Sequence, residues 1–483
     1  MGSLDDTICA VATPMGEGGV GIVRVSGSQA IPVASKILRL RSGKHLEQIK
    51  SYQLHLGQFL WDHFRSEKNG GKTVSAVLDE VLVVAMRAPR SYTGEDVVEI
   101  HGHGGPIIVH AICEALTQVG ARLAEPGEFT KRGFLNGRMD LTQAEAVLDT
   151  IRANSLQSLK LAQEHLQGGL SGIIQEQRDS LVKLLAHVEA GMDFGEEDIQ
   201  FIDQVELRES LQQISGKISQ LVDSAKEGRI IREGIRTVIV GRPNVGKSSL
   251  LNAILGTERA IVSRIPGTTR DVLEESVMVQ GAMIRFFDTA GLRETTDELE
   301  HEGMSRANQA IEQADVLVLA FDQSEPLNEN DVYFIRKYSC QQRVMVLTKH
   351  DLPPKFSLEE FQDLIQRKNQ DLEADPERVN CFQVCALTGE GIDSLKQAIK
   401  HLAVGQLYET GDSVLISKLR HKVLLENAGK ALQNAIIAID NTHSSECVAL
   451  ELRVALNALG EIVGIVTNED ILDQIFREFC IGK

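Results

Sequence analysis

The sequence lacks the features that direct a chain to a membrane or an oxidising compartment. No apolar run reaches the roughly 18 residues needed to cross a bilayer. The first residues show no basic segment followed by an apolar run, so no secretory signal is expected. The seven cysteines include no CxxC pair, and no second Cys/His cluster completes a zinc set around Cys381 and Cys385. These absences predict a cytoplasmic protein with reduced thiols and no membrane partner.

Positive charge is also in short supply. The chain has 50 Lys and Arg against 68 Asp and Glu, a formal net charge of −18. This balance disfavours loose, charge-driven binding to nucleic acid. It does not exclude RNA, because a local basic patch can act within an acidic whole.

The texture of the sequence changes along the chain and predicts a multidomain fold that combines α/β and all-α parts. Residues 1–135 mix β-type runs with Gly-rich turns, which predicts an α+β domain. Residues 136–230 and 404–483 have the apolar spacing of helices. Residues 231–403 alternate strand and helix patterns, which predicts a mostly parallel sheet. We therefore expect one helical domain with an α/β domain inserted in it.

The strongest motif is GRPNVGKS at residues 241–248, which fits GxxxxGK[ST]. It follows a β-type run and precedes a helical pattern, and this context separates a P-loop from a Gly-rich turn that binds nothing. The glycines let backbone N–H groups turn toward phosphate oxygens, and the helix N-terminus favours the negative charge. Lys247 is expected to reach the β- and γ-phosphates, and the Ser248 hydroxyl to hold Mg²⁺.

Three further motifs follow in the order typical of a Ras-like GTPase. Residues 267–270 (GTTR) suit a switch loop whose Thr reaches Mg²⁺. Asp288 and Gly291 belong to DTAG, where Asp can organise Mg²⁺ through water and Gly can approach the γ-phosphate. Residues 348–351 (TKHD) resemble the guanine-reading element, in which the Asp351 carboxylate accepts hydrogen bonds that adenine does not offer. Each motif is weak alone, but the ordered set predicts GTP binding.

Three departures from the usual pattern bear on affinity and mechanism. Thr348 stands where Asn is usual, so it offers only a hydroxyl, and Cys385 begins a Cys-Ala-Leu segment in place of Ser-Ala-Lys. The useful backbone N–H of Ala386 survives, so we expect GTP selectivity with modest affinity. Leu292 occupies the place of the Gln that orients water in Ras-type enzymes. Residues 293–302 are rich in carboxylates; any one of them alone is read as part of a solvated loop.

Matches in all three regions resemble the bacterial family of tRNA-modification GTPases called MnmE, or TrmE. The resemblance covers essentially the full length. Besides the nucleotide motifs it rests on four segments: 18–24 (GGVGIVR), 92–96 (YTGED), 126–136 (PGEFTKRGFLN) and the C-terminal 479–483 (FCIGK). The family's fold implies a folate-binding-like N-terminal domain at 1–135, which also dimerises, and a Ras-like P-loop domain at 231–403.

The resemblance implies a mechanism for the P-loop domain. The family's G domains dimerise across their nucleotide faces and use K⁺ in place of an arginine finger. The implied K⁺ ligands are Asn244, Ser263, Ile265 and Thr268. Thr269 would join Ser248 at Mg²⁺, and the water-positioning Glu falls at Glu300. The positions assigned to GTP binding are Asn244, Val245, Gly246, Lys247, Ser248, Ser249, Ser263, Thr268, Thr269, Asp288, Gly291, Thr348, Lys349, Asp351 and Ala386.

The resemblance also implies a folate site that holds 5-formyltetrahydrofolate as one-carbon donor. The matching positions are Arg24, Glu99, Arg138 and Lys483, and Glu99 suits an amino-pyrimidine edge while the cations suit carboxylates. From the residues alone, Arg24 could be a solvated edge residue and Arg138 the start of a helix. Cys480 matches a cysteine the family needs for modification, although a near-terminal thiol is by default a packed residue. His101-Gly102-His103 is interpreted as a Gly-rich turn rather than a metal pair.

The function implied is GTP-dependent modification of tRNA at C5 of the wobble uridine, with a carboxymethylaminomethyl-type group. The family works as a homodimer in a heterotetramer with an FAD-dependent subunit, MnmG (GidA), and FAD is assigned to that partner because no GxGxxG site is present here. One alternative is a regulatory GTPase switch that binds ribosomal RNA or assembly intermediates. Another is a folate-sensing scaffold with vestigial GTPase activity, which intact Lys247, Thr269 and Asp288 disfavour.

Overall fold

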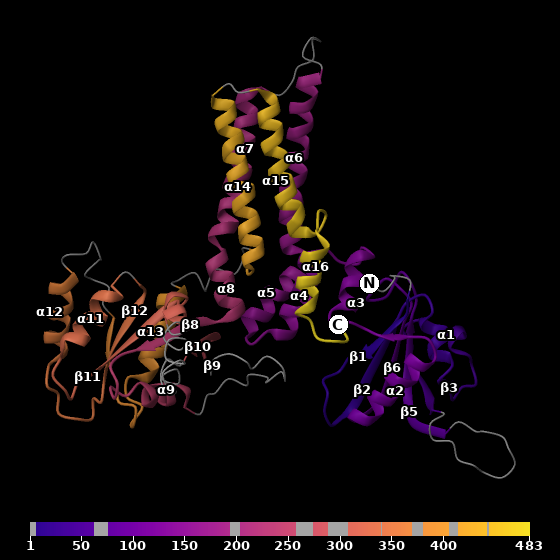
Figure 1. The fold of residues 1–483 in the computed structure, drawn as a ribbon, viewed down its shortest axis with the longest axis horizontal. Coiled ribbons are helices and arrows are strands. Elements are labelled where there is room, and N and C mark those ends of the chain that lie inside the picture. The colour runs from indigo at the N-terminus through magenta and orange to yellow at the C-terminus, as the bar shows by residue number, and fades with distance from the viewer. Residues whose placement is uncertain are drawn as a thin grey trace, which may run out of the picture. The chain divides into compact units, whose positions relative to one another are not determined.

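The computed structural model describes residues 6–61, 76–193, 203–256, 274–287, 308–339, 341–369, 380–404, 414–441 and 444–483. The chain divides into two compact units, each considered by itself (Figure 1). Unit 1 comprises Met1–Leu148, His165–Lys183 and Leu456–Lys483, and unit 2 comprises Asp149–Glu164 and Leu184–Ala455. These units cut across helices, so the four domain ranges expected from the sequence stay predictions.

Unit 1 contains a seven-stranded sheet in the order β3-β4-β5-β6-β2-β1-β7. All neighbours are antiparallel except β1 and β7. The strands are β1 (Ile8–Val11), β2 (Gly18–Ser26), β3 (Leu38–Leu40), β4 (His55–Trp61), β5 (Ala76–Met86), β6 (Val97–Gly104) and β7 (Arg122–Leu123). The helices are α1 (Ala30–Ser35), α2 (Pro106–Gln118) and α3 (Glu128–Leu135), with a 3-10 turn, η1 (Leu46–Gln48).

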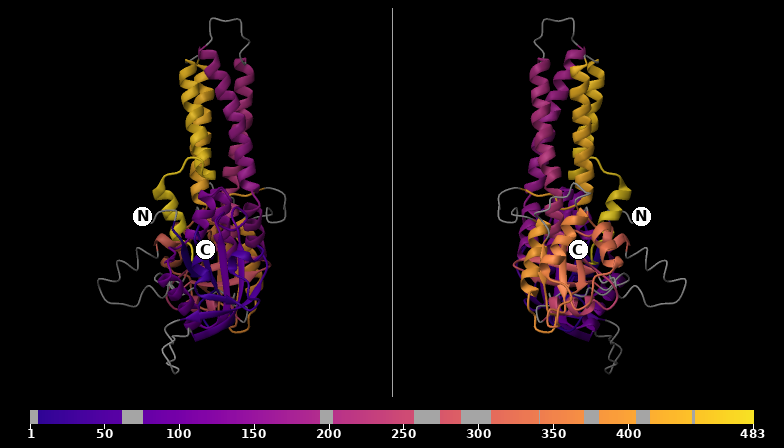
Figure 2. Two further views of the ribbon diagram at one scale, coloured as in Figure 1. Left: turned by 90° about the vertical axis from the view of Figure 1, so that its right-hand side faces the viewer. Right: turned by 90° about the vertical axis from the view of Figure 1, so that its left-hand side faces the viewer.

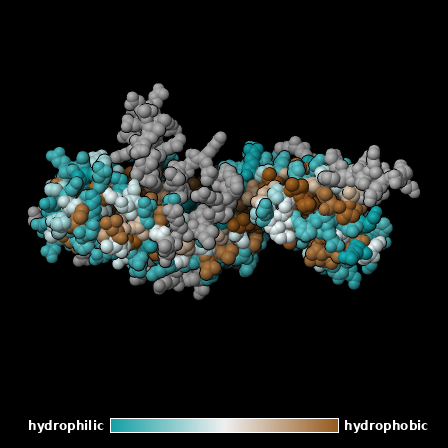
Figure 3. Space-filling model, turned by 90° about the horizontal axis from the view of Figure 1, so that it is seen from below, coloured by the Kyte–Doolittle hydropathy of each residue, from teal (hydrophilic) through white to brown (hydrophobic). Residues whose placement is uncertain are grey.

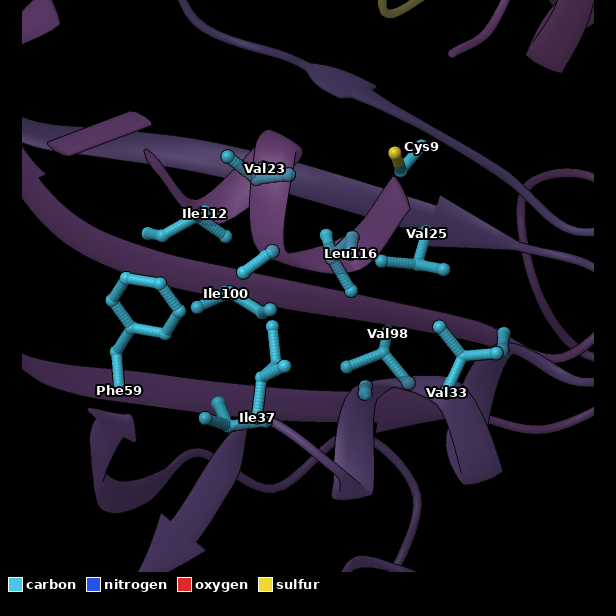
Figure 4. Close-up of a cluster of buried hydrophobic side chains, with 14 of the residues drawn as sticks. Cys9, Val23, Val25, Val33, Ile37, Phe59, Val98, Ile100, Ile112 and Leu116 are labelled. Carbon is cyan, nitrogen blue, oxygen red and sulfur yellow. The ribbon is translucent and has the colours of Figure 1, made fainter. Parts of the chain in front are cut away.

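Alternation along the central strands decides which side chains enter the core of this sheet. Val23 and Val25 on β2 are fully buried, as are Val98 and Ile100 on β6. Figure 4 shows these side chains gathered with Leu116 of α2 in one apolar cluster. Because successive side chains of a strand point to opposite faces, the residues between them lie on the other face. Strand register therefore brings two polar residues, Arg24 and Glu99, opposite each other.

The solvent face of the same sheet is partly apolar. Figure 3 shows brown apolar areas between teal polar ones on the described surface. Leu56 on β4 lies directly opposite Leu82 on β5, and both are exposed. His101 on β6 follows Leu82 in the same row across the sheet. Such a cross-strand row leaves apolar surface available to a partner.

The helical stretches before and after the second sheet pack together. The elements are α4 (Leu141–Arg152), α5 (Leu156–Leu166), α6 (Gly169–Asp193), α7 (Gln204–Asp223), α8 (Ala225–Glu233), α14 (Leu419–Asp440), α15 (Ser445–Val463) and α16 (Glu469–Arg477). Apolar side chains recur every three or four residues on α7 and on α14, and they are buried. Figures 1 and 2 show α7 and α14 side by side. Within unit 2, a helix from before the sheet thus packs against a helix from after it, and the single helical domain stays a prediction.

The first part of α4 packs against the end of the chain. Leu141, Ala144 and Leu148 share an apolar cluster with Phe476 and Phe479. Burying large aromatic side chains stabilises such contacts strongly. Within unit 1, Phe479 therefore anchors the C-terminal segment that carries Cys480.

Unit 2 contains a six-stranded sheet in the order β13-β12-β11-β8-β10-β9, parallel except between β9 and β10. Its strands are β8 (Ile235–Val240), β9 (Glu274–Val279), β10 (Ala282–Phe287), β11 (Val316–Asp322), β12 (Arg343–Thr348) and β13 (Cys381–Gln383). Its helices include α9 (Lys247–Leu255), α11 (Glu329–Lys337), α12 (Leu358–Asn369) and α13 (Ile392–Val404). Every residue of β11 is buried, as expected for a strand covered on both faces. The predicted mostly parallel sheet is confirmed.

Candidate functional site

The GRPNVGKS segment forms the turn between β8 and α9. Asn244 and Gly246 have φ values of 64° and 91°, in the left-handed region. A Cβ on Gly241 would lie 2.5 Å from the carbonyl oxygen of Ala320, so only glycine fits there. The loop therefore takes the tight path that turns backbone N–H groups toward one point, at the start of a nine-residue helix.

The polar side chains of this loop are placed for contact with a phosphate. Lys247 Nζ donates to the carbonyl oxygens of Gly241 (3.0 Å) and Arg242 (2.6 Å), so its ammonium lies over the loop. Ser248, Ser249 and Asn244 are exposed at the helix N-terminus. Their oxygens are the hard ligands that Mg²⁺ and K⁺ accept. The chemistry of this donor set fits a nucleotide phosphate with its cations.

Arg242 anchors the loop to a neighbouring helix. Its Nε donates to Asp331 Oδ1 at 2.7 Å, and Asp331 is fully buried in the first turn of α11. Asp331 also accepts from the backbone N–H of Asn328 in a capping box. A buried, hydrogen-bonded charge pair of this kind holds its two elements in one geometry. Sequence reasoning did not assign Arg242 a role, although it lies within the motif.

Thr348 ties the guanine motif to the P-loop. Its buried hydroxyl lies 2.6 Å from the carbonyl oxygen of Val245 and 3.0 Å from that of Phe321. A hydroxyl has a single proton to donate, so it can serve only one of these acceptors at a time. The Asn that is usual at this position has two amide protons. This geometry explains how Thr348 replaces the loop contact of Asn, with one hydrogen bond fewer.

Asp351 is exposed and lies beside Cys385. The Cys385 thiol donates to Asp351 Oδ1 over 3.3 Å and accepts from the Thr388 backbone N–H over 3.4 Å. Cys385 is 1% exposed. A cysteine here thus orients the carboxylate that would read guanine. Ala386 follows directly, so its backbone N–H lies at the same edge of the sheet.

Lys349 has a left-handed backbone, with φ of 58°, and its ammonium pairs with Asp322 at 2.5 Å. Burial alone would raise the pKa of Asp322, but hydrogen bonds from Lys349 and Ser324 bring it below its ordinary value. Asp322 is the last residue of β11 and is 2% exposed. It therefore stays ionised and holds Lys349 beside the P-loop strand. No motif pointed to Asp322, and its only signal is its place at a parallel strand's carboxyl end.

Several assigned positions lie outside the described residues. They are Ser263, Ile265, Thr268, Thr269, Asp288, Gly291 and Glu300, together with Leu292. Asp288 directly follows β10, the strand that was expected to precede it. Among the residues that the structure describes, no group of three His, Cys, Asp or Glu could hold a metal ion.

A second polar cluster lies on unit 1 around Arg24. Arg24 Nε and Nη2 both contact Glu99 Oε1, at 2.9 and 2.8 Å. His101 Nε2 lies 3.2 Å from the other Glu99 oxygen. The guanidinium also lies over the rings of Tyr92 (5.3 Å) and Phe129 (5.7 Å), which favours a cation. The hydrogen bond from His101, aided by Arg24, lowers the pKa of Glu99 despite its burial.

The C-terminal segment completes this cluster. The carbonyl oxygen of Gly482 lies 3.5 Å from Arg24 Nη1, and a Cβ on Gly482 would lie 2.1 Å from the carbonyl oxygen of Val11. Gly482 has φ of 95°, so both space and backbone require glycine. Burial, then the Arg24 charge, lowers the pKa of Lys483. Arg24, Glu99 and Lys483 are thus brought together, with the exposed Cys480 beside them.

Two further expectations concern this region. Arg138 lies in the connection before α4, where its Nε donates to the Ser91 carbonyl oxygen at 3.0 Å, on the loop that carries Tyr92. This hydrogen bond places Arg138 beside the loop that carries Tyr92, and its assignment to the folate site stays a prediction. The interpretation of residues 101–103 as a Gly-rich turn is wrong, because they belong to β6. A Cβ on Gly102 would meet Asp79 Oδ2 at 2.8 Å, and that carboxylate accepts instead from His103.

The chain is similar to known proteins over its whole length. A family model described as MnmE helical domain matches residues 141–480, and one described as GTP-binding protein TrmE N-terminus matches residues 7–138. The chain is 43% identical to the tRNA modification GTPase MnmE of Geobacillus kaustophilus, over 99% of both chains. It is 44% identical to that of Moorella thermoacetica and 40% identical to that of Bacillus subtilis, over 99% of this chain and 100% of each relative.

Among solved structures, the G domain of the T. maritima FeoB iron transporter matches 35% of this chain and 98% of that chain. The identity is 25% and the TM-score 0.26.

Proposed function

Since the chain belongs to the family of tRNA modification GTPases called MnmE, we propose that it hydrolyses GTP in the course of modifying tRNA. The product would be a wobble uridine with a carboxymethylaminomethyl-type group at C5. A separate FAD-dependent subunit, MnmG, would act with a homodimer of this chain in a heterotetramer, in the cytoplasm. The observation that carries the proposal is the pairing, within one family member, of a P-loop with the Arg24 cluster that holds the Cys480 segment.

The nucleotide chemistry is assigned to the loop geometry described above. Lys247 would contact the β- and γ-phosphates, and Asp351 with the Ala386 N–H would bind guanine. Ser248 and Thr269 would hold Mg²⁺. Asn244, Ser263, Ile265 and Thr268 would hold K⁺, and both cations offset negative charge on the phosphates. Glu300 would position water, the task for which Leu292 lacks a polar group.

This mechanism has its own test. Glu300→Ala should slow GTP turnover at least tenfold while leaving GTP affinity nearly unchanged. Equal losses of both would assign Glu300 a structural role. Replacing K⁺ with Na⁺ should suppress hydrolysis by the wild-type protein, and insensitivity to that exchange would rule out the K⁺ assignment.

The Arg24 cluster is proposed to bind 5-formyltetrahydrofolate. Its groups suit both ends of that ligand: Glu99 for an amino-pyrimidine edge, and the cations Arg24, Lys483 and Arg138 for carboxylates. Tyr92 supplies an aromatic wall beside them. Cys480, exposed next to Lys483, would serve the modification step. When bound, the ligand supplies the one-carbon unit.

The exposed apolar row on the same sheet supports dimerisation through unit 1. Leu56 and Leu82 lie opposite each other on the face away from the core. A second copy of the chain would cover this apolar pair. G domains in such a dimer could meet across their nucleotide faces and exclude water.

Coupling of hydrolysis to the helical domain is proposed to pass through Asp149. This residue of α4 is 8% exposed and accepts from Arg232 Nε at 2.9 Å, while Lys418 Nζ lies 3.5 Å away. Arg232 belongs to α8, the helix that directly precedes the first strand of the second sheet. Lys418 directly precedes α14, the helix that follows α13 in the chain. One carboxylate therefore holds both connections of the inserted domain.

Asp149→Asn tests this coupling. It should leave GTP binding unchanged and lower tRNA modification severalfold, because a neutral amide cannot pair with two cations. Locking the G domains together with a cross-link should abolish modification. Full modification in the locked protein would contradict a role for their opening and closing.

The decisive experiment is calorimetric titration of the purified protein with 5-formyltetrahydrofolate, with Arg24→Ala as control. Saturable binding that is lost in the control would link unit 1 to one-carbon chemistry and leave the ribosomal-switch alternative with little support. Absence of binding would leave a GTPase but remove the physical basis for one-carbon transfer by this chain.

A further inference from the structure

A basic region stands out in this acidic chain. Residues 36–50 contain five Lys or Arg and a single acidic residue, Glu47, although the whole chain has a net charge of −18. Arg87 and Arg90 add two more cations from a distant segment. The usual meaning of a charge run is a solvated face, so the region has to be judged by its contacts.

The two segments meet at one edge of the unit 1 sheet. The backbone N–H of Arg87 donates to Ser51 Oγ at 3.1 Å, and Arg87 Nη2 donates to the Glu47 carbonyl oxygen at 2.7 Å. These two hydrogen bonds join the loop between β3 and β4 to the segment after β5. We call the cations Arg39, Arg41, Lys44, Lys50, Arg87 and Arg90 the basic edge; Arg87 is half-buried and the other five are exposed. Lys36 is not counted because its ammonium lies at the end of α2, where it donates to the carbonyl oxygen of Val119.

Most of the basic edge is not neutralised. Within the part of the chain that the structure describes, no ion pair involves the side chains of Arg39, Lys44, Lys50 or Arg90, which are exposed. Arg41 lies 3.4 Å from Glu80, with both side chains mostly exposed. In unit 2, by contrast, Arg242 and Lys349 each meet a buried carboxylate. Unpaired cations clustered on one edge produce a local positive potential that attracts polyanions.

The nearby acidic groups are few and partly engaged. The Glu47 carboxylate accepts from Ser35 Oγ at 2.8 Å, and Asp96 accepts from the Ala88 backbone N–H at 2.8 Å. Glu80, which pairs with Arg41, is a third carboxylate beside the edge. These carboxylates are outnumbered by the cations, so the edge keeps an excess of positive charge.

An exposed aromatic residue lies within the edge. Tyr52 is 60% exposed and has φ of 62°, a left-handed conformation that costs free energy for any residue with a Cβ. Its backbone N–H donates to the carbonyl oxygen of Ala85 at 3.0 Å, and its hydroxyl donates to the carbonyl oxygen of Arg90. The hydroxyl thus ties the ring to the Arg90 segment while most of the residue stays exposed, and backbone strain of this kind is concentrated at functional positions.

We propose that the basic edge and Tyr52 form a docking surface for RNA, with the phosphates on the cations and an unpaired base stacked on the Tyr52 ring. Stacking of bases on aromatic side chains and contact of Lys or Arg with phosphates are two common means by which proteins bind looped RNA. The inference rests on the proposed function, which makes tRNA the RNA concerned. An acidic protein partner would use the cations but has no base for the exposed ring.

The test uses full-length protein and an unmodified tRNA transcript, with binding followed by fluorescence anisotropy at several salt concentrations. The variant Arg39→Glu/Lys44→Glu/Lys50→Glu should bind at least tenfold more weakly. For this variant, the slope of log affinity against log salt concentration should be shallower by about 0.7 to 0.9 for each phosphate that is no longer neutralised. A matched control, Lys183→Glu/Lys217→Glu/Lys430→Glu, makes the same charge change at exposed lysines of the helical domain.

Tyr52→Asn removes the ring while Asn still tolerates the left-handed backbone. It should weaken binding about fivefold or more without changing the salt slope. Retained binding of 5-formyltetrahydrofolate by each variant would establish that unit 1 is folded.

The outcomes separate this inference from the proposed function. Equal effects of the edge and control variants would overturn the inference, and so would loss of MnmG binding with tRNA binding intact, which would assign the edge to the partner protein. Failure of the proposed function would instead appear in the wild type, as tRNA left unmodified in the presence of MnmG. Weaker tRNA binding by both the triple variant and Tyr52→Asn, against an unaffected control, would support the inference.

Discussion

The P-loop site and the Arg24 cluster are built in opposite ways. The groups proposed to bind phosphate at the P-loop site come from eight consecutive residues, and many of these groups are backbone N–H groups. The Arg24 cluster takes its groups from four distant segments, and Arg24 and Gly482 are separated by 458 positions. A site made of consecutive residues, here called contiguous, is visible as a motif in the sequence. A site made of distant residues, here called assembled, forms only when the sheet and the C-terminal segment have packed. Damage to the two should therefore be separable.

The largest expected effect comes from breaking the contiguous site. Lys247→Ala removes the ammonium that lies over the loop and should lower the GTP turnover number roughly 100-fold or more, because such electrostatic groups act on charge in the transition state. Affinity for 5-formyltetrahydrofolate should stay within about twofold of wild type. Phosphate-release kinetics and calorimetry measure the two. Concurrent loss of both would show that the sites are not independent.

Binding at the assembled site should be lost when a residue far from Arg24 in the sequence is substituted. Gly482→Ala forces a Cβ against the Val11 carbonyl oxygen and strains a left-handed backbone, so it should displace the C-terminal segment. We expect folate affinity to fall about tenfold or more, with GTP turnover unchanged. Gly172→Ala is the matched control, because a Cβ there meets nothing within 4 Å. Normal folate binding by Gly482→Ala would remove the C-terminal segment from the site.

A smaller effect is expected at the joint between the guanine motif and the P-loop. Thr348→Asn offers two amide protons to the carbonyl oxygens of Val245 and Phe321, where the hydroxyl offers one. GDP affinity should rise about threefold, within the usual contribution of one hydrogen bond. Thr348→Val, which removes the donor at similar volume, should lower it. Fluorescent nucleotide titration measures both, and a decrease with Asn would mean that the site is shaped for Thr.

The smallest effect concerns acid stability of unit 1. Burial would raise the pKa values of Asp6 and Glu128, but hydrogen bonds from Arg122 and Arg132 lower them. Carboxylates with a lowered folded pKa contribute stability that is present above the unfolded value, about 4, and lost as pH falls through the folded values. At pH 6 the Arg132→Met variant should therefore melt at a lower temperature than wild type. As the pH falls to 3, this difference in melting temperature should shrink by a few degrees. A constant difference would mean that packing of Arg132, not its charge, is responsible.

Sequence reasoning succeeded where function follows from backbone path and failed where side chains cross strands. The turn of the P-loop and the mostly parallel sheet could be recognised from local pattern, and the guanine-reading role of residues 348–351 stays a prediction. The interpretation of residues 101–103 was wrong, because a Gly between two His resembles a turn when Gly102 in fact makes room for Asp79 of the adjacent strand. Asp322, Arg242 and Tyr92 were missed, since each acts through a contact with a residue far away in the chain.

What the sequence by itself determined is the identity of the nucleotide machinery, because a loop that binds phosphate through consecutive N–H groups must be written as consecutive residues. It also determined the alternation that buries Val23 and Val25 and so turns Arg24 to the other face. Only the tertiary structure decided that Glu99, Tyr92 and Lys483 surround Arg24, and that Asp149 holds both connections of the inserted domain. Such groupings depend on strand register and on packing of the chain's end, which sequence spacing does not encode.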